Sequence, residues 1–408
     1  MNDCRKTVLD NGLRVISESM TSVRSVSLGI WVRAGSVNEG TYNNGISHFL
    51  EHMLFKGTVH RTARDIATSL ETFGGSLNGS TGKEISLYTA YVLDEHLPLA
   101  VDVLSDMIQN PLFLESDMQV EKDVVLSEIS QAREDPEEMI IDYFYQSMFP
   151  DHPLGTFIYG TEDNIKNFNS HDLFHYLKNQ YTTPRIVFAA AGNVNHDRLV
   201  ELVQTCFSKF VADLPYRVDP LRKNPVQFND NRSPHLHQAH FVIGSRIMGY
   251  LEEDKYAMSL LDVLLGGGMS SRLFQNIREK YGFPYSIYSF VDFMATTGVF
   301  GVYSSSPFDK LDKTMQLIHD ELDKLCEGMV DQDELEQIKS QVRGAMLLGH
   351  ESSSRRMRRI GENEIFRGDY VDLDKILHII EGITPEDITQ MARRYLNKDN
   401  RSITLLTP

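Results

Sequence analysis

The chain has 408 residues, of which 41% are hydrophobic and 24% are charged, and its formal net charge is −17 at pH 7. This composition is typical of a globular protein with two or three domains. The acidic balance argues against binding to nucleic acid or to an anionic membrane surface, and no apolar run reaches the roughly 18 residues that span a bilayer. The N-terminal residues have no apolar core of the signal-peptide type, so we expect a cytoplasmic protein.

Strand and helix patterns alternate along the first half of the chain. A hairpin is predicted around Asp10-Asn11-Gly12, and a strand follows over 25–35. Helical spacing predicts helices over 43–57 and 62–75, and residues 76–92 predict two strands joined by a turn. The remaining predicted elements of this half are helices over 94–109, 115–134, 136–149, 170–181 and 195–209, and a strand over 185–191.

The same order of elements returns after residues 212–234, a segment with four prolines that is typical of a linker. The second half predicts strands over 238–247, 285–293 and 297–305, and helices over 252–265, 270–281, 307–327 and 331–350. We therefore predict an α+β fold of two similar, duplicated domains, each an antiparallel-rich sheet packed with helices. The predicted boundaries are 1–211 for the N-terminal domain, 212–234 for the linker and 235–408 for the C-terminal domain.

The segment HFLEH (48–52) places two histidines four residues apart, with a glutamate just before the second. On a helix, His48 and His52 project from the same face and can bind one metal ion, while Glu51 lies beside it. Two neutral nitrogens and a carboxylate that accepts a proton from bound water are the parts of a hydrolytic zinc site. A helix with two exposed histidines is the alternative, but it fits poorly with the apolar residues around them.

A catalytic zinc also needs a third protein ligand. The predicted helix over 115–134 offers Glu121 and Glu128, which are seven residues apart and fall on nearly the same face. One of them can bind the metal while the other holds a histidine ring in place. Both could instead be solvated carboxylates on the helix surface, and the spacing alone does not decide between these interpretations.

Two other groups of histidines are weaker candidates. His171 and His175 are also four apart, but no acidic residue precedes the second, which favours a surface helix. In the segment HLHQAH, His235 and His237 would share one face of a strand and His240 the other. Neither group is expected to be a functional metal site.

Three longer segments accompany the motif: NGISHFLEHMLFKGT (44–58), GGSLNGSTGKEISLYTAYV (74–92) and GGMSSRLFQNIREKYGFPYSIYS (267–289). His-x-x-Glu-His is the inverted zincin motif. Together with Glu128 downstream, these segments make the chain resemble the pitrilysin–insulinase family of zinc peptidases over essentially its whole length. Within that family it is most similar to the mitochondrial-processing-peptidase type and its short bacterial homologues.

The resemblance implies a role for each of eight residues. One Zn²⁺ per chain would be bound by His48, His52 and Glu128, with Glu51 as the general base and Glu121 supporting a ligand from behind. The substrate would contact Asn78, on a strand edge where a peptide adds as an extra strand. It would also contact Arg278 and Tyr285 near the scissile carbonyl. The C-terminal domain has no His-x-x-Glu-His, so it would contact substrate without binding zinc.

Three segments bear on how closely the chain follows the family. Proline stands at 284, where the family often has alanine before the tyrosine, and this restricts the backbone leading to Tyr285. Gly79 stands where alanine is common after the asparagine. The glycine run at 266–268 is short compared with the long glycine-rich loop of the non-catalytic processing-peptidase subunit, which indicates the catalytic type.

The family fold is a clam shell around a chamber, and this chain has the length of one half, so the resemblance implies a homodimer. Arg278 and Tyr285 of one chain would then serve the zinc of the other. We predict a zinc-dependent endopeptidase that hydrolyses peptides or unfolded segments inside the chamber, using zinc-bound water activated by Glu51. The acidic charge favours basic peptides. The alternatives are a non-catalytic or helper subunit of a related peptidase complex, and a hydrolase of non-peptide substrates, which the segment 76–92 disfavours.

Overall fold

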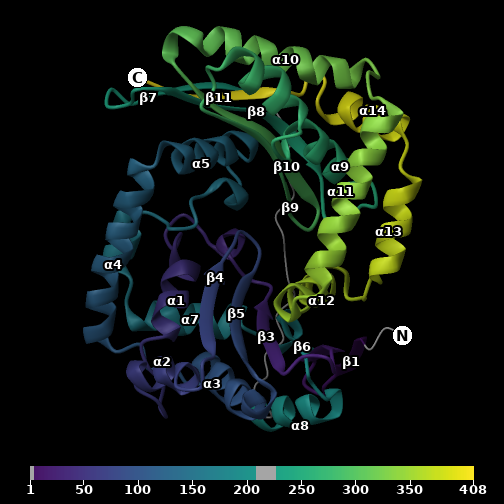
Figure 1. The fold of residues 1–408 in the computed structure, drawn as a ribbon. Coiled ribbons are helices and arrows are strands. Elements are labelled where there is room, and N and C mark those ends of the chain that lie inside the picture. Colours follow the sequence, from purple (N-terminus) through teal and green to yellow (C-terminus); the bar gives the residue numbers. More distant parts are fainter. Residues whose placement is uncertain (1–3, 208–226) are drawn as a thin grey trace. The chain divides into compact units, whose positions relative to one another are not determined.

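The computed structural model describes residues 4–207 and 227–408, and its chain forms two compact units (Figure 1). The first unit contains Met1–Ser130, Thr156–Asp219 and Leu347–Asp372. The second contains Gln131–Gly155, Pro220–Met346 and Leu373–Pro408. Within the described residues, no helix combines the length and the apolar character needed to cross a membrane.

The first unit is built on a six-stranded sheet with the order β1-β2-β6-β3-β5-β4. Its strands are β1 (Cys4–Val8), β2 (Arg14–Ser19), β3 (Ser25–Val32), β4 (Ser76–Thr81), β5 (Ser86–Leu93) and β6 (Ile186–Gly192). Its helices are α1 (Ile46–Leu54), α2 (Ala63–Glu71), α3 (Leu97–Gln109), most of α4 (Glu115–Glu134), α6 (Glu162–Asn167), α7 (Ser170–Gln180), α8 (His196–Cys206) and α12 (Ser353–Arg367). Among the described residues, strand β4 pairs only with β5, so its outer edge is open to pairing there.

The second unit is built on a five-stranded sheet with the order β7-β11-β8-β10-β9. Its strands are β7 (Phe228–Arg232), β8 (Ala239–Met248), β9 (Ser286–Phe293), β10 (Thr297–Ser306) and β11 (Ser402–Thr407). Its helices are α5 (Pro136–Met148), α9 (Lys255–Gly266), the π-helical segment η5 (Phe274–Glu279), α10 (Leu311–Cys326), most of α11 (Gln332–His350), α13 (Leu373–Gly382) and α14 (Pro385–Tyr395).

The two sheets share one topology, which confirms the predicted duplication. The order β2-β6-β3-β5-β4 in the first unit corresponds to β7-β11-β8-β10-β9 in the second. In each sheet the first of these pairs is parallel and the other three are antiparallel. The predicted α+β class, with antiparallel-rich sheets packed with helices, is therefore correct.

The two units differ from the predicted contiguous domains because each contains a helix from the other half of the chain. Helix α5 precedes residue 211 but packs on β8 and β11 of the second unit, whereas α12 follows residue 235 but packs on β2, β3 and β6 of the first. Residues 212–226 of the predicted linker lie outside the described residues, and 228–232 form β7 rather than a linker. Sequence patterns indicate a helix but not the sheet on which it packs.

Buried ion pairs attach α12 to the first sheet. Glu364 is fully buried and pairs with Lys6 at 2.8 Å and with Arg14 at 3.3 Å. Glu18 of β2, which is 1% exposed, pairs with Arg356 at 2.7 Å and with Arg359 at 2.8 Å. Removing one partner of such a pair leaves an uncompensated buried charge, so these contacts are costly to break.

We expect Glu364→Gln to lower the free energy of unfolding by about 3 kcal/mol, because Lys6 and Arg14 lose the charge that compensates them. Urea unfolding followed by circular dichroism measures the change. Glu201→Gln is the matched control, because Glu201 pairs with Arg198 on the exposed surface of the same unit and should cost under about 1 kcal/mol. Equal effects of the two substitutions would contradict the role given to Glu364.

Helix α1 is fixed by the main core of the first unit. Ile46, Phe49, Leu50, Met53 and Leu54 are all at most 2% exposed, as their helical spacing predicts. The apolar side of the helix is therefore buried, and the polar residues of HFLEH lie on the remaining arc. A rigid helix of this kind holds its polar side chains in fixed directions.

Candidate metal centre

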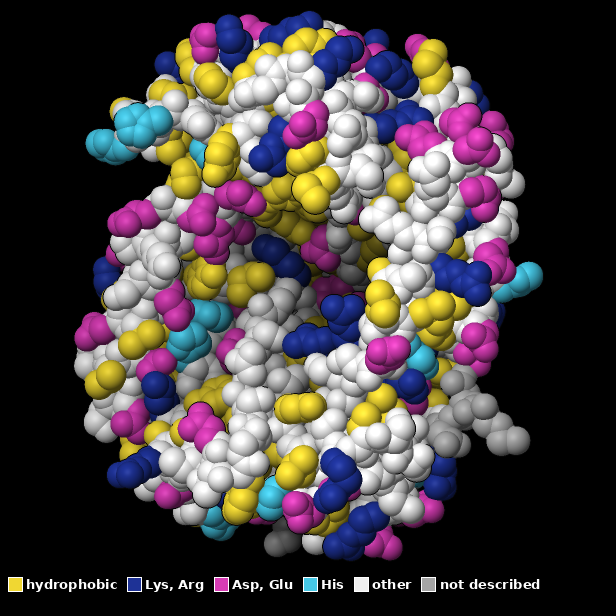
Figure 2. Space-filling view, in the orientation of Figure 1, with side chains coloured by type: hydrophobic (Ala, Val, Ile, Leu, Met, Phe, Trp, Pro, Cys, Tyr) yellow, Lys and Arg dark blue, Asp and Glu magenta, His cyan; other side chains and the backbone are white. Residues whose placement is uncertain are grey.

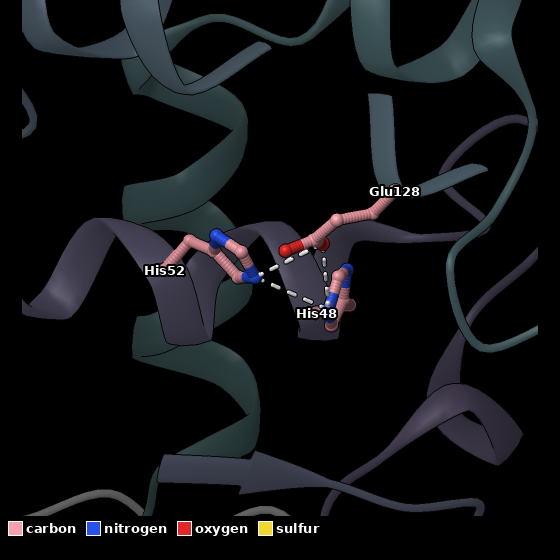
Figure 3. A group of neighbouring side chains, drawn as sticks. All are labelled: His48, His52 and Glu128. Carbon is pink, nitrogen blue, oxygen red and sulfur yellow. Dashed lines mark hydrogen bonds and ion pairs between the residues drawn. The ribbon is translucent and has the colours of Figure 1, made fainter. Parts of the chain in front are cut away.

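Two histidines of α1 and one glutamate of α4 converge in the first unit (Figure 3). The Nε2 atoms of His48 and His52 are 3.2 Å apart. Oε2 of Glu128 lies 3.7 Å from Nε2 of His48 and 3.5 Å from Nε2 of His52. The three candidate ligand atoms lie within 4.8 Å of one another, and no other such group of His, Cys, Asp or Glu occurs among the described residues.

Glu121, about two helical turns before Glu128, lies behind the site. It is 3% exposed, and its Oε1 lies 2.8 Å from Nδ1 of His52, while its Oε2 pairs with Lys56 at 2.5 Å. Because a carboxylate accepts hydrogen bonds, Nδ1 of His52 donates, which leaves the Nε2 lone pair directed at His48 and Glu128. Glu128 thus lies among the candidate ligand atoms, whereas Glu121 contacts the other nitrogen of His52. The seven-residue spacing alone could not show which glutamate takes which position.

The pKa values of the two histidines are shifted in opposite directions. Burial lowers the pKa of His48 to about 3, with a smaller contribution from His52, so its imidazole is neutral at pH 7. Burial also lowers the pKa of His52, but the hydrogen bond to Glu121 and the charge of Glu128 outweigh burial, so its pKa is raised. A proton and a metal ion therefore compete for His52.

The residues present fit a zinc ion. Oε2 of Glu128 is buried and has no hydrogen-bond partner among the described residues, although it lies close to two imidazole nitrogens. A cation among these three atoms would satisfy them together. Two imidazole nitrogens and one carboxylate oxygen are a ligand set typical of catalytic zinc, which keeps a further position open.

Glu51 is half-buried beside the three ligands, and its side chain is held by β4. Its Oε2 accepts a 2.7 Å hydrogen bond from Oγ1 of Thr81. The side chain also packs on Gly79, where an added Cβ would lie 2.7 Å from Oε1 of Glu51. Burial raises the pKa of Glu51, and the opposing effects of Thr81 and His52 do not cancel it. A carboxylate with a raised pKa is a better proton acceptor near neutral pH.

We expect Thr81→Val to reduce kcat about tenfold without loss of zinc, since a hydrogen bond to a charged group is worth about 1.5 kcal/mol or more. Valine keeps the shape of threonine but cannot orient Glu51. Steady-state kinetics and metal analysis of the purified variant give the two readouts. Thr72→Val, an exposed change at the end of α2, is the matched control and should leave kcat unchanged. An unaltered kcat in Thr81→Val would show that the hydroxyl does not position Glu51.

The free edge of β4 presents backbone groups next to Glu51. Because the amide of Gly82 donates to the carbonyl of Ile85 at the hairpin turn, alternation along the β4–β5 register directs the N–H and C=O groups of Leu77, Gly79 and Thr81 outward. Asn78 lies on this strand, and its Oδ1 accepts a 3.0 Å hydrogen bond from the amide of Gly79. The edge can therefore accept an extended peptide once Asn78 releases that amide.

Arg278 and Tyr285 lie in the second unit. Arg278, on η5, is exposed, and its guanidinium lies 4.7 Å from the centre of the Phe274 ring. Tyr285 is 77% exposed and precedes β9. The structure thus places these two residues in one unit, and the histidines, Glu51 and Asn78 in the other.

In the described part of the chain, the rival histidines belong to no cluster of three or more potential metal ligands. The rings of His171 and His175 are 6.2 Å apart, and Nε2 of His175 is bonded to the Asn179 side chain. His240 is hydrogen-bonded to the hydroxyl of Tyr303.

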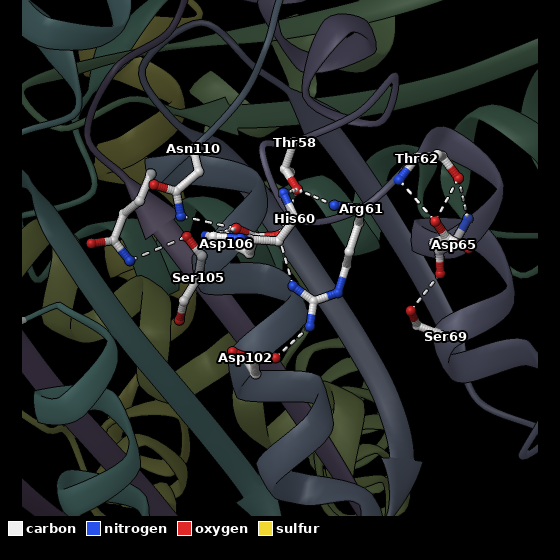
Figure 4. Close-up of polar contacts among 11 residues, drawn as sticks. Thr58, His60, Arg61, Thr62, Asp65, Ser69, Asp102, Ser105, Asp106 and Asn110 are labelled. Atoms are coloured by element: carbon white, nitrogen blue, oxygen red, sulfur yellow. Dashed lines mark hydrogen bonds and ion pairs between the residues drawn. The ribbon is translucent and has the colours of Figure 1, made fainter.

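A network that sequence reasoning missed fixes the loop between α1 and α2 (Figure 4). The buried carboxylate of Asp106 on α3 accepts hydrogen bonds from Thr58 at 2.6 Å, Arg61 at 2.7 Å and Asn110 at 2.9 Å. Arg61 also pairs with Asp102. Because the donors and acceptors come from separate segments, no local pattern could have identified the network.

The duplicated α+β fold, and a helix with the sequence His-x-x-Glu-His beside a downstream glutamate, are the features expected of the inverted zincin class. Residues 14–162 match the family described as insulinase (peptidase family M16), and residues 167–342 match the peptidase M16 inactive domain. The chain belongs to the insulinase family of peptidases. The second half, which matches the inactive domain, contains no His-x-x-Glu-His.

Similar sequences in bacteria are named as zinc proteases. An uncharacterized zinc protease of Streptomyces coelicolor is 36% identical over 99% of this chain and 89% of its own length. An uncharacterized zinc protease of Mycobacterium tuberculosis is 39% identical over 97% of this chain and 91% of its own length. One of Bacillus subtilis is 35% identical over 99% of this chain and 98% of its own length.

Similar solved structures establish the fold alone, because their sequences are distant. A protease from Helicobacter pylori has a TM-score of 0.94 at 22% identity and covers all of both chains. A chain of complex III from Candida albicans has a TM-score of 0.85 at 19% identity and covers 99% of this chain and 95% of its own. One fold thus occurs in a protease and in a chain of complex III.

Proposed function

We propose that this protein is a zinc-dependent endopeptidase that hydrolyses peptides or unfolded segments. The observation that carries the proposal is the convergence of His48, His52 and Glu128 beside Glu51. The carboxylate of Glu51 is hydrogen-bonded to Thr81 and not to these three residues. Similar chains are named zinc proteases, which supports zinc as the metal and a peptide bond as the target. Zinc, when bound, supplies a Lewis acid that polarises the scissile carbonyl and acidifies the attacking water.

Glu51 then performs the proton transfers. Its Oε2 is held by Thr81, so Oε1 is the oxygen that accepts a proton from the attacking water and passes it to the leaving amine. The hydrogen bond to Glu121 holds His52 in the tautomer with its proton on Nδ1, which keeps Nε2 available as a ligand. The free edge of β4 holds the substrate as an added strand, and this pairing selects extended peptides.

Removal of zinc tests this proposal. We expect a chelator to abolish cleavage of an unfolded protein such as reduced, alkylated casein, and a stoichiometric addition of zinc to restore it. A folded protein of similar size should not be cleaved, because its strands cannot add to β4. Cleavage that persists after metal analysis shows no zinc would overturn the proposal.

A homodimer would supply the rest of the site, with Arg278 and Tyr285 of one copy completing the centre of the other. Mixing two inactive variants tests this arrangement. In a mixed dimer of Glu51→Gln and Tyr285→Phe, the intact zinc site of one chain meets the intact Tyr285 of the other, so activity should reappear. If mixed dimers form but activity does not return, Arg278 and Tyr285 would instead act on the metal centre of their own chain.

Basic peptides are the expected substrates, on the basis of the net charge of −17. Asp and Glu side chains are spread over the face in Figure 2, with Lys and Arg among them, so the preference is argued from the net charge and not from a patch on that face. Peptides of one length with opposite charge should differ in KM, and equal KM values would contradict a preference for basic peptides.

A helper subunit is the alternative function. Stoichiometric zinc without any peptide cleavage would support it.

A further inference from the structure

The first turn of α1 is anchored by a carboxylate that belongs neither to the helix nor to the metal site. Gly45 precedes the helix with φ of +97° and has no side chain to cap it. Glu39, which is 5% exposed, takes that place. Its Oε2 accepts hydrogen bonds from the Gly45 amide at 2.8 Å and the Asn44 side chain at 2.9 Å, and its Oε1 accepts one from the Ser47 amide at 2.8 Å.

Through Asn44, the contacts of Glu39 also reach the segment 157–159, which lies against His48. The side-chain amide of Asn44 also donates to the carbonyl of Phe157 at 2.9 Å. Next to it, a Cβ added to Gly45 would lie 2.7 Å from the carbonyl oxygen of Tyr159, so the two backbones are in close contact. The Tyr159 ring in turn meets the His48 ring edge-on, with centroids 5.0 Å apart.

The two histidines of the centre are therefore held in different ways. His52 is oriented by its hydrogen bond to Glu121. Nδ1 of His48 is buried and has no hydrogen-bond partner among the described residues, so no comparable bond orients this ring. Its direction depends on the backbone of the first turn and on Tyr159. Glu39 contacts the first turn directly, and through Asn44 it reaches Phe157, two residues before Tyr159.

We infer that Glu39 is a positioning residue for the metal centre, which sets the direction of His48 through Asn44, Gly45 and Ser47. The inference rests on the proposed function of His48 as a ligand. Both oxygens of Glu39 accept from N–H donors, so glutamine, which has one accepting oxygen, cannot replace it without placing an N–H group against another. A carboxylate also suits the N-terminus of a helix.

Zinc affinity, measured by competition with a chromophoric chelator, tests the inference. We expect Glu39→Gln to weaken zinc binding by about 10- to 100-fold, as outer contacts of metal ligands commonly do. At saturating zinc, kcat should return to within about twofold of wild type, because Glu39 does not touch the substrate. Glu39→Asp keeps the charge but shortens the reach, so it should recover part of the affinity.

Glu364→Gln is the matched control, because Glu364 is also a buried glutamate of the same unit, but its ion pairs are with Lys6 and Arg14 and not with α1. It should lower the urea midpoint without altering zinc affinity. Asn44→Ala removes the side chain that links Glu39 to the carbonyl of Phe157. Its zinc affinity tests the same inference if Glu39→Gln does not fold. Unchanged zinc affinity in both anchor variants would overturn the inference but leave the proposed function intact. Absence of zinc binding in wild type would overturn the proposed function itself.

Discussion

Glu51→Gln should abolish peptide cleavage while leaving about one zinc per chain. Glutamine matches the size of glutamate and can still accept the hydrogen bond from Thr81, so the site keeps its shape. It cannot take a proton from water at neutral pH, and the loss of a general base costs a factor of about 10² to 10⁴ in rate. We therefore expect kcat to fall about 10³-fold.

Metal analysis and steady-state kinetics on the same preparation measure both outcomes. The control is Glu71→Gln, an exposed change on α2, which should alter neither zinc content nor kcat. Cleavage within about tenfold of wild type by Glu51→Gln would show that another group transfers the proton. Loss of zinc would show instead that Glu51 contributes to binding the metal.

Glu128→Gln should lose zinc, whereas Glu121→Gln should only weaken its binding. The two glutamates lie on the same helix, but Glu128 faces both histidines, and Glu121 contacts His52 from behind. The binding energy of a protein zinc site, on the order of 10 kcal/mol or more, is shared among few ligands, so losing one costs about three orders of magnitude in affinity. A contact behind a ligand is worth about 10- to 100-fold.

The zinc dissociation constants of the two variants give the comparison directly. Glu115→Gln, at the exposed start of the same helix, is the control and should bind zinc like wild type. If Glu121→Gln proved the weaker binder of the pair, the assignment of the third ligand would have to be reversed. Cleavage should follow zinc occupancy in both variants.

The elements that carry the site could be predicted because their signals are local. Helix α1 shows apolar residues at helical spacing, Thr62 caps α2 at the start of the predicted helix, and β4 and β5 flank the predicted turn. The pair His48 and His52 follows from helix geometry alone. Such features depend on residues within a few positions of one another.

The features that could not be predicted depend on contacts between distant segments. The choice between Glu121 and Glu128 is made by where α4 lies against α1. Strand β7 has the sequence FNDNR, which has little strand propensity, and it forms by parallel pairing with β11 near the end of the chain. The exchange of α5 and α12 between the units, and the anchor at Glu39, likewise arise only in the folded chain.

The most direct test of the metal centre is anomalous scattering from crystals of the purified protein, measured on both sides of the zinc absorption edge. We expect one zinc peak per chain, about 2.0 to 2.2 Å from Nε2 of His48, Nε2 of His52 and an oxygen of Glu128. Glu51 should lie next to the ion without binding it. A zinc-loaded protein whose peak lies elsewhere, or whose three side chains remain free of metal, would contradict the assignment of this site.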